Sequence, residues 1–573
     1  MAGATQTDGF TAWKTQALNR YVARRAGSAQ AATGFVSQPE PRSIGLFARG
    51  KQLVAGNFLF AGHLLQAPGV GMWDVAAPHV AFVAEAQGFA WMDDLAAVGD
   101  SAARGRAQEW TWDWIARFGT GTGPGWTPDL TGRRVIRWIN HALLLLTNQD
   151  RAASDAYFAA LTRQVVFLSR RWHGAAPGLP RFEALAGLIY AGLALTGMED
   201  RVAPAISALA HECDAEIDAF GSIPTRNPEE LLEVFTLLSW AAQALGEAGR
   251  VMPPAHLAAI ERIAPTLRAL RHADGDLARF HGGGRGMEGR LDHALANAGV
   301  RAVVAPGLAM GFARLAGGRT TVIVDAASPP DGRAGGSAHA STLGFEMTSG
   351  RRPVIVSCGS GAPFGAEWTR AGRATPSHST LAIDGFSSSR LGTGPREIMT
   401  DRAVVLQARQ QNDVAGHLMH LSHAGWSATH GLTHQRDLIL SADGRRLTGQ
   451  DVLAALTAAE RKRFEQVMTR TALQGVRHTT RFHLHPDVDA EIDMGGNAVS
   501  LALKSGEIWV FRHDGWAALT LEASVYLEKG RLRPRACKQI VLTGTAVDFE
   551  SRIGWTLAKA QDTPLAIRDL DRG

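Results

Sequence analysis

The feature that most limits the folds open to this chain is a change in hydrophobic periodicity near residue 311. Before this point, long segments carry apolar residues at the spacing of one face of an α-helix. After it, the apolar runs are short, rich in Val, Ile and Thr, and bounded by Gly, Asp, Asn and Ser. Runs of this kind are typical of β-strands. We therefore predict a helical domain over 1–310 and a β domain over 311–573.

The helical half contains long segments separated by short loops that carry Gly or Pro. Successive helical hairpins of this kind build either an α-solenoid or a closed α/α barrel. No fixed period of about 33–47 residues recurs, which argues against an array of the TPR or HEAT type. We expect helices at 11–25, 103–118, 131–146, 152–172, 181–196, 202–216, 228–245 and 254–272.

The β half contains many short strand-like runs, and we expect no helices between them. This organisation indicates an antiparallel sandwich. The dipeptides Asp443-Gly444 and Asp514-Gly515 are signals of hairpin turns, because both residue types tolerate positive φ angles. Strands are expected at 320–326, 343–347, 353–357, 379–383, 403–408, 436–440, 480–485, 498–503, 508–512, 518–527 and 538–543.

Composition excludes several classes of protein. A chain of 573 residues is too long for one compact core, so two or three domains are expected. The net charge of +5 is spread over the chain without a Lys/Arg tract, which argues against nucleic acid as a partner. The three cysteines lie far apart, in no spacing that suits a disulfide framework or a zinc finger.

The sequence also bears on where the protein is found. No run approaches 18 uncharged apolar residues, so we expect no membrane span. The N-terminus lacks a basic stretch followed by an apolar one, so we expect no secretory signal. The expected location is therefore the cytoplasm, unless a start site upstream was trimmed. A homodimer is left open.

Polar and titratable residues gather between 335 and 385 of the β half. His339 and His378 stand where two strand-like segments begin, and Arg370 and Arg373 precede the second histidine. A neutral imidazole can take up a proton, and an imidazolium can stabilise a developing enolate. Arginine recognises carboxylates through paired hydrogen bonds. The run predicts a site for an anionic sugar; the alternative is that each histidine only satisfies backbone groups at a strand end.

One face of the expected helix 131–146 carries a second candidate group. Helical spacing places Arg134, Trp138 and His141 together, with Asn140 on the neighbouring face. A sugar ring stacked on Trp138, with an arginine pairing with its carboxylate, would make a sensible site. The alternative is a helix with a solvated basic face and the tryptophan in the core.

A glycine-rich loop before the domain junction presents His281 and Arg285. It contains a formal GxGxxG pattern, but no βαβ unit surrounds it, so we reject dinucleotide binding. Clefts between domains are common ligand sites, which makes these two residues candidates. The alternative is a simple hinge.

Several of these segments carry a resemblance to a known family. The runs HASTLGFEM from residue 339, VIVSCG from residue 354 and RATPSHSTLAIDG from residue 373 resemble the heparinase II/III family of polysaccharide lyases. WTPDLTGRRVIRWINHALLLL, from residue 126, extends the resemblance into the helical half. The resemblance implies an incomplete (α/α) toroid followed by an antiparallel β-sandwich, with an anionic polysaccharide bound between them and cleaved next to a uronic acid by β-elimination.

The resemblance assigns positions to individual residues. His339 matches the second histidine of the family's His-x-His-Ala-Asp pattern, and His378 matches the histidine of its His-Asn-Thr pattern. Serine replaces a family residue at four places, Ser337, Ser341, Ser357 and Ser379. Ser357 stands where the family often has an aspartate associated with bound zinc, so a zinc ion near His339 is doubtful; we predict no metal ligands and leave the cofactor unknown. Tyr190 is the best candidate for the family's tyrosine.

We therefore predict a lyase-like enzyme acting on a uronate-containing polysaccharide or oligosaccharide in a cleft between the domains. The acid/base candidates are His339, His378, His281 and His141. The substrate-binding candidates are Asn140, Arg134, Trp138, Arg370, Arg373 and Arg285. One alternative is a catalytically degenerate protein that binds acidic glycans in exopolysaccharide handling, for which the resemblance suggests the periplasm. Another is an α-solenoid interaction scaffold.

Overall fold

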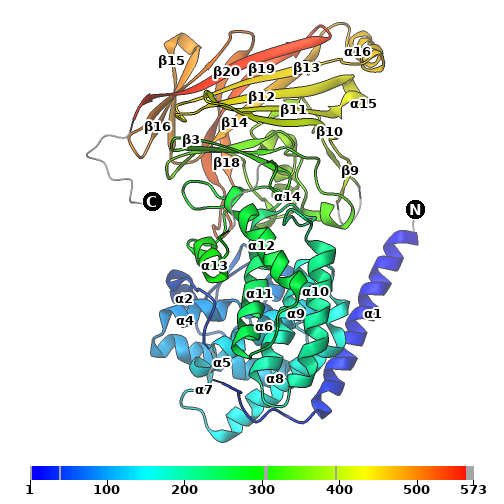
Figure 1. The fold of residues 1–573 in the computed structure, drawn as a ribbon, viewed down its shortest axis with the longest axis vertical. Helices are drawn as coiled ribbons and strands as arrows, with labels where there is room; N and C mark the ends of the chain where they lie inside the picture. The colour runs from blue at the N-terminus through cyan, green and yellow to red at the C-terminus, as the bar shows by residue number, and fades with distance from the viewer. Residues whose placement is uncertain (1–2, 38–39, 302–306, 394–396, 563–573) are drawn as a thin grey trace. The chain divides into compact units, whose positions relative to one another are not determined.

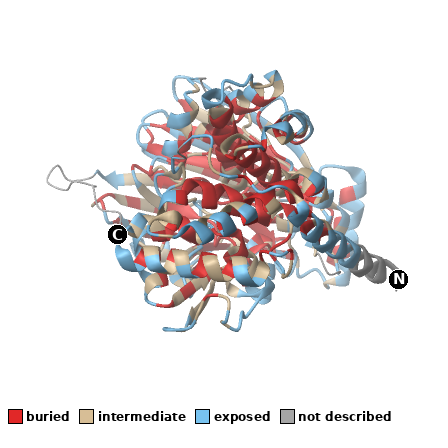
Figure 2. Cartoon of the chain, turned by 90° about the horizontal axis from the view of Figure 1, so that it is seen from below, coloured by how far each residue is buried: buried red, intermediate tan, exposed pale blue. Residues whose placement is uncertain are grey.

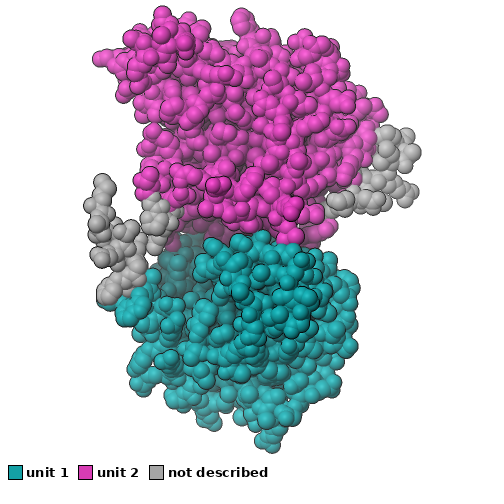
Figure 3. All heavy atoms as spheres, turned by 180° about the vertical axis from the view of Figure 1, so that it is seen from behind, with its two compact units in different colours: residues 1–219, 232–263, 294–300 teal, residues 220–231, 264–293, 301–573 magenta. Residues whose placement is uncertain are grey.

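The chain forms two compact units. The computed structural model describes residues 3–37, 40–301, 307–393 and 397–562, with side chains from residue 12 onward. Unit 1 comprises residues 1–219, 232–263 and 294–300, and unit 2 comprises 220–231, 264–293 and 301–573 (Figure 3). The boundary expected near residue 310 coincides with the start of the large sheets at β3 (Phe312–Gly317). The compact units, in contrast, exchange segments between residues 219 and 301.

Unit 1 is helical, as predicted (Figure 1). Buried residues run along the inward sides of its helices and exposed residues along the outer sides (Figure 2). Across the described residues, no helix is both long and apolar enough to cross a membrane. Besides the hairpin of β1 (Asn57–Phe60) and β2 (His63–Gln66), the unit contains α1 (Gly3–Arg25), α2 (Phe47–Val54), α3 (Val80–Gly88), α4 (Trp91–Val98), α5 (Ser101–Phe118), α6 (Pro128–Asn140), α7 (Ala142–Leu146), α8 (Arg151–Arg171), α9 (Leu179–Ala194), α10 (Val202–Glu216) and parts of α11 (Pro228–Glu247), α12 (Pro254–Ala269) and α13 (Arg290–Ala298).

The predicted helix 131–146 is interrupted at His141. Helix α6 ends before this residue and α7 begins after it, because His141 has φ −109° and ψ 25°, outside the helical range. Its ring nitrogen Nε2 lies 2.8 Å from Asp93 Oδ1 of α4. This contact joins residues 48 positions apart, so hydrophobic periodicity could not indicate the break.

Helices α6 and α9 approach each other backbone to backbone. A Cβ atom added to Gly187 of α9 would lie 2.5 Å from Gly132 Cα of α6, and one added to Gly132 would collide with the backbone of Glu183. Two glycines facing each other therefore allow a closer approach than any side chain would. This approach brings Asn140 of α6 beside Tyr190 of α9.

The substitution Gly187→Ala is expected to destabilise unit 1 by about 1–3 kcal/mol, because the added methyl group meets backbone atoms that cannot turn aside. Chemical denaturation followed by circular dichroism at the helical band measures the loss. Gly105→Ala is the matched control, since Gly105 lies within α5 and a Cβ there meets nothing within 4 Å. The control is expected to stabilise by about 0.5–1 kcal/mol through helix propensity. Equal effects of the two substitutions would contradict the close approach.

Unit 2 is an antiparallel β-sandwich, as predicted. One eight-stranded sheet has the order β10-β11-β12-β13-β20-β17-β16-β15, and the other runs β18-β19-β14-β6-β5-β4-β3, with β7 paired to β14. Inward-facing residues of both sheets, among them Phe345, Phe482 and Trp555, form one buried core. The strands that concern the site are β4 (Thr320–Asp325), β5 (Phe345–Ser349), β6 (Arg352–Val356), β7 (Leu381–Ile383), β11 (Gly416–Trp426), β12 (Leu432–Ser441), β13 (Arg446–Ala454), β14 (Val476–Leu484) and β20 (Glu550–Gln561).

Unit 2 differs from the sequence predictions in two respects. The expectation of no helices among the strands is wrong, because α14 (Ala366–Gly372), α15 (Ser427–His430) and α16 (Ala458–Arg470) lie there. Asp443-Gly444 does connect the paired strands β12 and β13. Asp514-Gly515 does not form a hairpin, since β17 (Ile508–His513) and β18 (Ala518–Tyr526) belong to different sheets. The chain instead crosses between the sheets at this turn.

Candidate functional site

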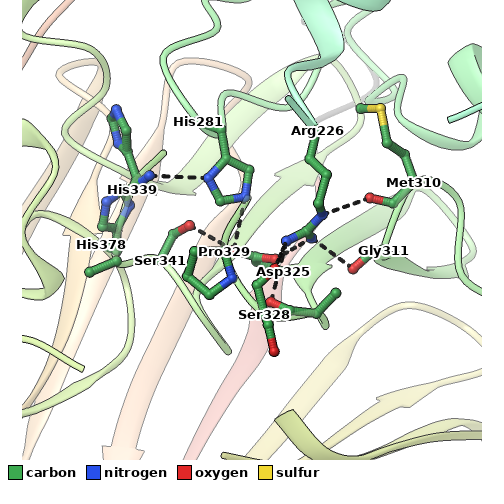
Figure 4. Close-up of polar contacts among 12 residues, drawn as sticks. Arg226, His281, Met310, Gly311, Asp325, Ser328, Pro329, His339, Ser341 and His378 are labelled. Atoms are coloured by element: carbon green, nitrogen blue, oxygen red, sulfur yellow. Dashed lines mark hydrogen bonds and ion pairs between the residues drawn. The ribbon is translucent and has the colours of Figure 1, made fainter. Parts of the chain in front are cut away.

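Three of the histidines singled out from the sequence lie together in unit 2 (Figure 4). His281 Nδ1 accepts a hydrogen bond of 3.2 Å from the backbone N–H of His339. The rings of His339 and His378 lie 5.3 Å apart, centroid to centroid, in an edge-to-face arrangement. We call these three residues the histidine cluster. All three are buried, with exposed fractions of 0–4%.

A buried carboxylate supports one side of the histidine cluster. Asp325, at the end of β4, lies 3.5 Å from His281 Nε2 and accepts a 2.6 Å hydrogen bond from the Ser341 hydroxyl. Arg226 donates to the other carboxylate oxygen at 2.5 Å and also to the carbonyl oxygens of Met310 and Gly311 (Figure 4). The family resemblance assigned an aspartate to the position of Ser341. The structure supplies a carboxylate at this point from β4 instead.

The backbone around this carboxylate is strained. Arg226, His281, Met310 and Leu343 all have positive φ angles, between 47° and 62°. Residues other than glycine adopt this conformation rarely, and such residues gather at functional sites when the surrounding contacts hold them there. Leu343 donates its N–H to the Asp325 carbonyl, and Arg226 bonds to the Met310 carbonyl, so the contacts of the cluster connect the strained residues. The strain marks this part of unit 2 as a functional candidate.

The imidazoles of the histidine cluster are held neutral. Burial lowers the pKa of each ring well below its usual value, and the neighbouring histidines and arginines lower it further. Within the described residues, His339 Nδ1 and His378 Nε2 have no hydrogen-bond partner. Neutral rings with a free nitrogen can accept or donate a proton.

The residues present do not fit a zinc site. No group of three or more His, Cys, Asp or Glu side chains in the described part of the chain is arranged to hold a metal ion. Ser357, at the position where the resemblance implied a zinc-associated aspartate, lies 3.1 Å from His378 Nδ1 through its hydroxyl. A hydroxyl is a weak substitute for a carboxylate ligand, so we derive no step through a metal.

The three arginine candidates of unit 2 have different surroundings. Arg373 is buried and donates to the carbonyl oxygens of Ala338 and Gly335, which fixes the turn before His339. Arg370 lies on the exposed side of α14 and pairs with Glu397 at 2.5 Å. Arg285 is partly exposed, 3.4 Å from Asp276 and 3.3 Å from Glu528. The arginine that adjoins the histidine cluster through its hydrogen bonds is therefore Arg373.

Two candidates of unit 1 lie in its core. Arg134 has no exposed surface and donates to the Gln164 side chain and to the carbonyl oxygens of Gln87 and Gly125. Trp138 is also fully buried, and its ring stacks on Tyr157 with centroids 5.7 Å apart. These contacts give both side chains a packing role in unit 1. They leave neither side chain a face on which a sugar could stack.

Asn140 belongs to a polar group that does suit a carboxylate. The Tyr190 hydroxyl donates to Asn140 Oδ1 at 2.5 Å, and Asn140 Nδ2 is buried with no partner among the described residues. The Arg42 guanidinium carbon lies 5.7 Å from the centre of the Tyr190 ring. Burial raises the pKa of the Tyr190 phenol, and Arg42 lowers it again in part. We call Arg42, Asn140 and Tyr190 the tyrosine group.

Arg42 is itself held in place from helix α11. Its Nη1 donates to Gln243 Oε1 at 2.6 Å, and its Nη2 pairs with Glu247, whose side chain is 67% exposed. Sequence reasoning named Asn140 and noted Tyr190 but missed Arg42. The three residues are far apart in the chain and lie in different elements, so no local spacing connects them.

Residues 300–556 match the family model described as Heparinase II/III-like, C-terminal. The chain is 31% identical over 547 residues to FtsZ-localized protein C of Caulobacter vibrioides, covering 92% of this chain and 91% of that protein. Among solved structures it is similar to heparinase III, with a TM-score of 0.65 and 11% identity over 96% of this chain and 91% of that one. It is also similar to a mutant of heparan sulfate lyase HepC from Pedobacter heparinus, with a TM-score of 0.59 and 14% identity over 96% and 89%. The structural matches confirm the predicted fold, a helical toroid followed by a β-sandwich.

Proposed function

Because the chain belongs to the heparinase II/III-like family, we propose that it is a polysaccharide lyase-like enzyme that cleaves a uronate-containing glycan by β-elimination. The observation that carries this proposal is the tyrosine group of unit 1. It combines an amide N–H without a partner, a phenol and a guanidinium. These are the groups that elimination next to a carboxylate requires.

The chemistry assigns each residue a task. The C5 proton of a uronate becomes acidic only when the charge of the neighbouring carboxylate is offset. Asn140 Nδ2, which lacks a partner in the described structure, can donate to that carboxylate. The Tyr190 oxygen then takes the C5 proton, the electron pair forms the C4–C5 double bond, and the bond from C4 to the leaving oxygen breaks. A proton delivered to that oxygen completes the step.

Arg42 makes the phenol a better base. A cation beside a phenol favours its ionised form, which opposes the effect of burial. The exposed carboxylate of Glu247 balances this guanidinium from the solvent side. The histidine cluster is a second proposed proton-transfer group, since its rings are neutral and two of its nitrogens have no partner among the described residues.

Incubation with a panel of uronate-containing glycans tests the proposal. Elimination produces an unsaturated uronate, so ultraviolet absorbance is expected to rise with acidic glycans and to stay flat with neutral ones. The variants His339→Gln and His378→Gln, measured in the same way, determine whether the histidine cluster shares in proton transfer. Binding to an acidic glycan without any absorbance change would support the catalytically degenerate alternative. A folded protein that neither binds nor cleaves any acidic glycan would refute both.

A second function is favoured by one specific comparison. The identity of 31% with a protein named for its localisation to FtsZ extends over nearly the whole of both chains. We propose on this basis that the chain is recruited to FtsZ. A fluorescent fusion is expected to colocalise with FtsZ in dividing cells, and a uniformly distributed fusion that still retains its fold would exclude this role.

A further inference from the structure

A buried carboxylate holds the ring of His141 from helix α4. Asp93 Oδ1 lies 2.8 Å from His141 Nε2 and accepts a 2.6 Å hydrogen bond from the Ser43 hydroxyl. The other oxygen, Oδ2, lies 3.4 Å from Arg137 Nε. Only 9% of the Asp93 side chain and 4% of the His141 side chain are exposed. The pair therefore forms a closed, fully hydrogen-bonded unit.

The carboxylate is ionised and therefore accepts only. Burial by itself would raise the pKa of Asp93, but Arg137, His141 and Ser43 lower it below its ordinary value. An ionised carboxylate has no proton to donate, so a neutral His141 ring must carry its proton on Nε2. Nδ1 is then the lone-pair nitrogen, and it makes no hydrogen bond to any residue of the described structure.

The position of His141 joins this unit to the tyrosine group. His141 directly follows Asn140 and ends helix α6 with a non-helical backbone. The interruption of the helix turns the ring toward α4, where Asp93 receives it. A histidine whose tautomer is fixed by a carboxylate is the arrangement that acid–base catalysis uses.

We propose that Asp93 is a positioning residue that fixes the tautomer of His141, so that Nδ1 is the nitrogen that exchanges a proton with substrate. The role in turnover rests on the proposed lyase function, whereas the tautomer does not. No local sequence pattern indicates this role, because Asp93 lies 48 residues before His141. The neighbouring Asp94 does not share it, since it accepts from the Leu46 backbone N–H and faces Arg49.

The substitution Asp93→Asn is expected to reverse the tautomer. Arg137 can only donate, so the new amide oxygen is drawn to the Oδ2 position beside it. The amide NH2 then faces His141 Nε2 and the Ser43 hydroxyl, both of which must accept. The neutral ring is forced into the Nδ1–H form. Two-bond 1H–15N correlation spectra of protein labelled in histidine, at a pH where the ring is neutral, report the tautomer directly, and the spectrum of His141→Gln assigns the signal.

The expected result is an Nε2–H signal for His141 in the unmodified protein and an Nδ1–H signal in Asp93→Asn. Asp94→Asn is the matched control, because it removes the adjacent buried carboxylate of α4, and it should leave the tautomer unchanged. With a cleaved glycan in hand, Asp93→Asn is expected to lower kcat by about 100-fold while KM changes little. Combining it with His141→Gln should add little further loss.

An unchanged His141 tautomer in Asp93→Asn would overturn the proposal, as would an equal change in Asp94→Asn. The spectra require no substrate. A silent glycan panel therefore refutes the proposed lyase function while the tautomer experiment still decides whether Asp93 positions His141.

Discussion

The substitution Arg436→Met is expected to destabilise unit 2 by about 3–5 kcal/mol, because it leaves the Asp451 carboxylate buried without its cation. Arg436 on β12 donates to both oxygens of Asp451 on β13, at 2.7 and 3.1 Å. Neither side chain has any exposed surface. A buried charge that loses its partner must be desolvated without compensation, which is among the largest effects of any single substitution.

The surrounding contacts increase the expected loss. Asp451 also accepts from Trp555 Nε1 at 3.0 Å and lies 2.8 Å from His434 Nε2. Arg436 Nη1 donates to the carbonyl oxygens of Leu343 and Ser379, at 2.8 and 3.0 Å. These two carbonyls belong to the segments that precede β5 and follow His378, so the substitution also loosens the support of the histidine cluster.

The loss is expected to depend on pH. Burial alone would raise the pKa of Asp451, but Arg436 and His434 together hold it well below its usual range. A carboxyl whose pKa is lowered by folding stabilises the fold at pH values above its unfolded pKa of about 3.9, and the contribution disappears as the pH falls below that value. The difference between the unmodified protein and Arg436→Met should therefore be complete at neutral pH and shrink in acid.

Hydrogen exchange of the backbone amides in β12 and β13 measures this loss locally, which avoids assuming that two units unfold in one step. Arg445→Met is the matched control, because Arg445 pairs with Asp562 at 2.6 Å while both side chains remain about half exposed. That substitution should cost less than about 1 kcal/mol. Similar losses for the two variants would show that the buried pair contributes no more than a surface pair.

The general fold could be predicted from the sequence because it depends on local patterns. The helical period before residue 311 and the short β-rich runs after it follow from which faces are buried, and both halves form as predicted. Helix α16 could also have been found. Thr457 and Glu460 form a complete capping box at its start, and this pattern is visible in the sequence.

The candidate sites depend on contacts that no local pattern records. The sequence indicated His281, His339 and His378, and the structure brings them together. It did not indicate Asp325 or Arg226, which meet across 99 residues and support His281. Trp138 had the spacing of an exposed sugar platform, yet it is buried because five other aromatic or aliphatic layers of unit 1 close over α6 only in the folded chain.

The substitution Tyr190→Phe is expected to lower the rate of glycan cleavage by about 100- to 10,000-fold, which is the range that a positioned acid–base group contributes. It removes the hydroxyl that bonds to Asn140 and leaves the ring in place beside Arg42. The phenylalanine can neither take the C5 proton nor hold the amide of Asn140 in orientation. Since no larger group is introduced, the fold should be retained. The expected signature is a fall in kcat with little change in KM, measured by the ultraviolet absorbance of the unsaturated product.

Tyr157→Phe is the control that separates chemistry from packing. The Tyr157 hydroxyl is also buried and donates to the Trp138 carbonyl at 2.7 Å. Its removal leaves a carbonyl unsatisfied, so we expect a loss of about 1–3 kcal/mol in stability but unchanged turnover in the folded protein. Tyr190→Phe should show the opposite pattern, with activity lost and stability nearly kept. If Tyr190→Phe cleaves glycan at the unmodified rate, the base is not in the tyrosine group, and the histidine cluster of unit 2 becomes the only proposed source of it.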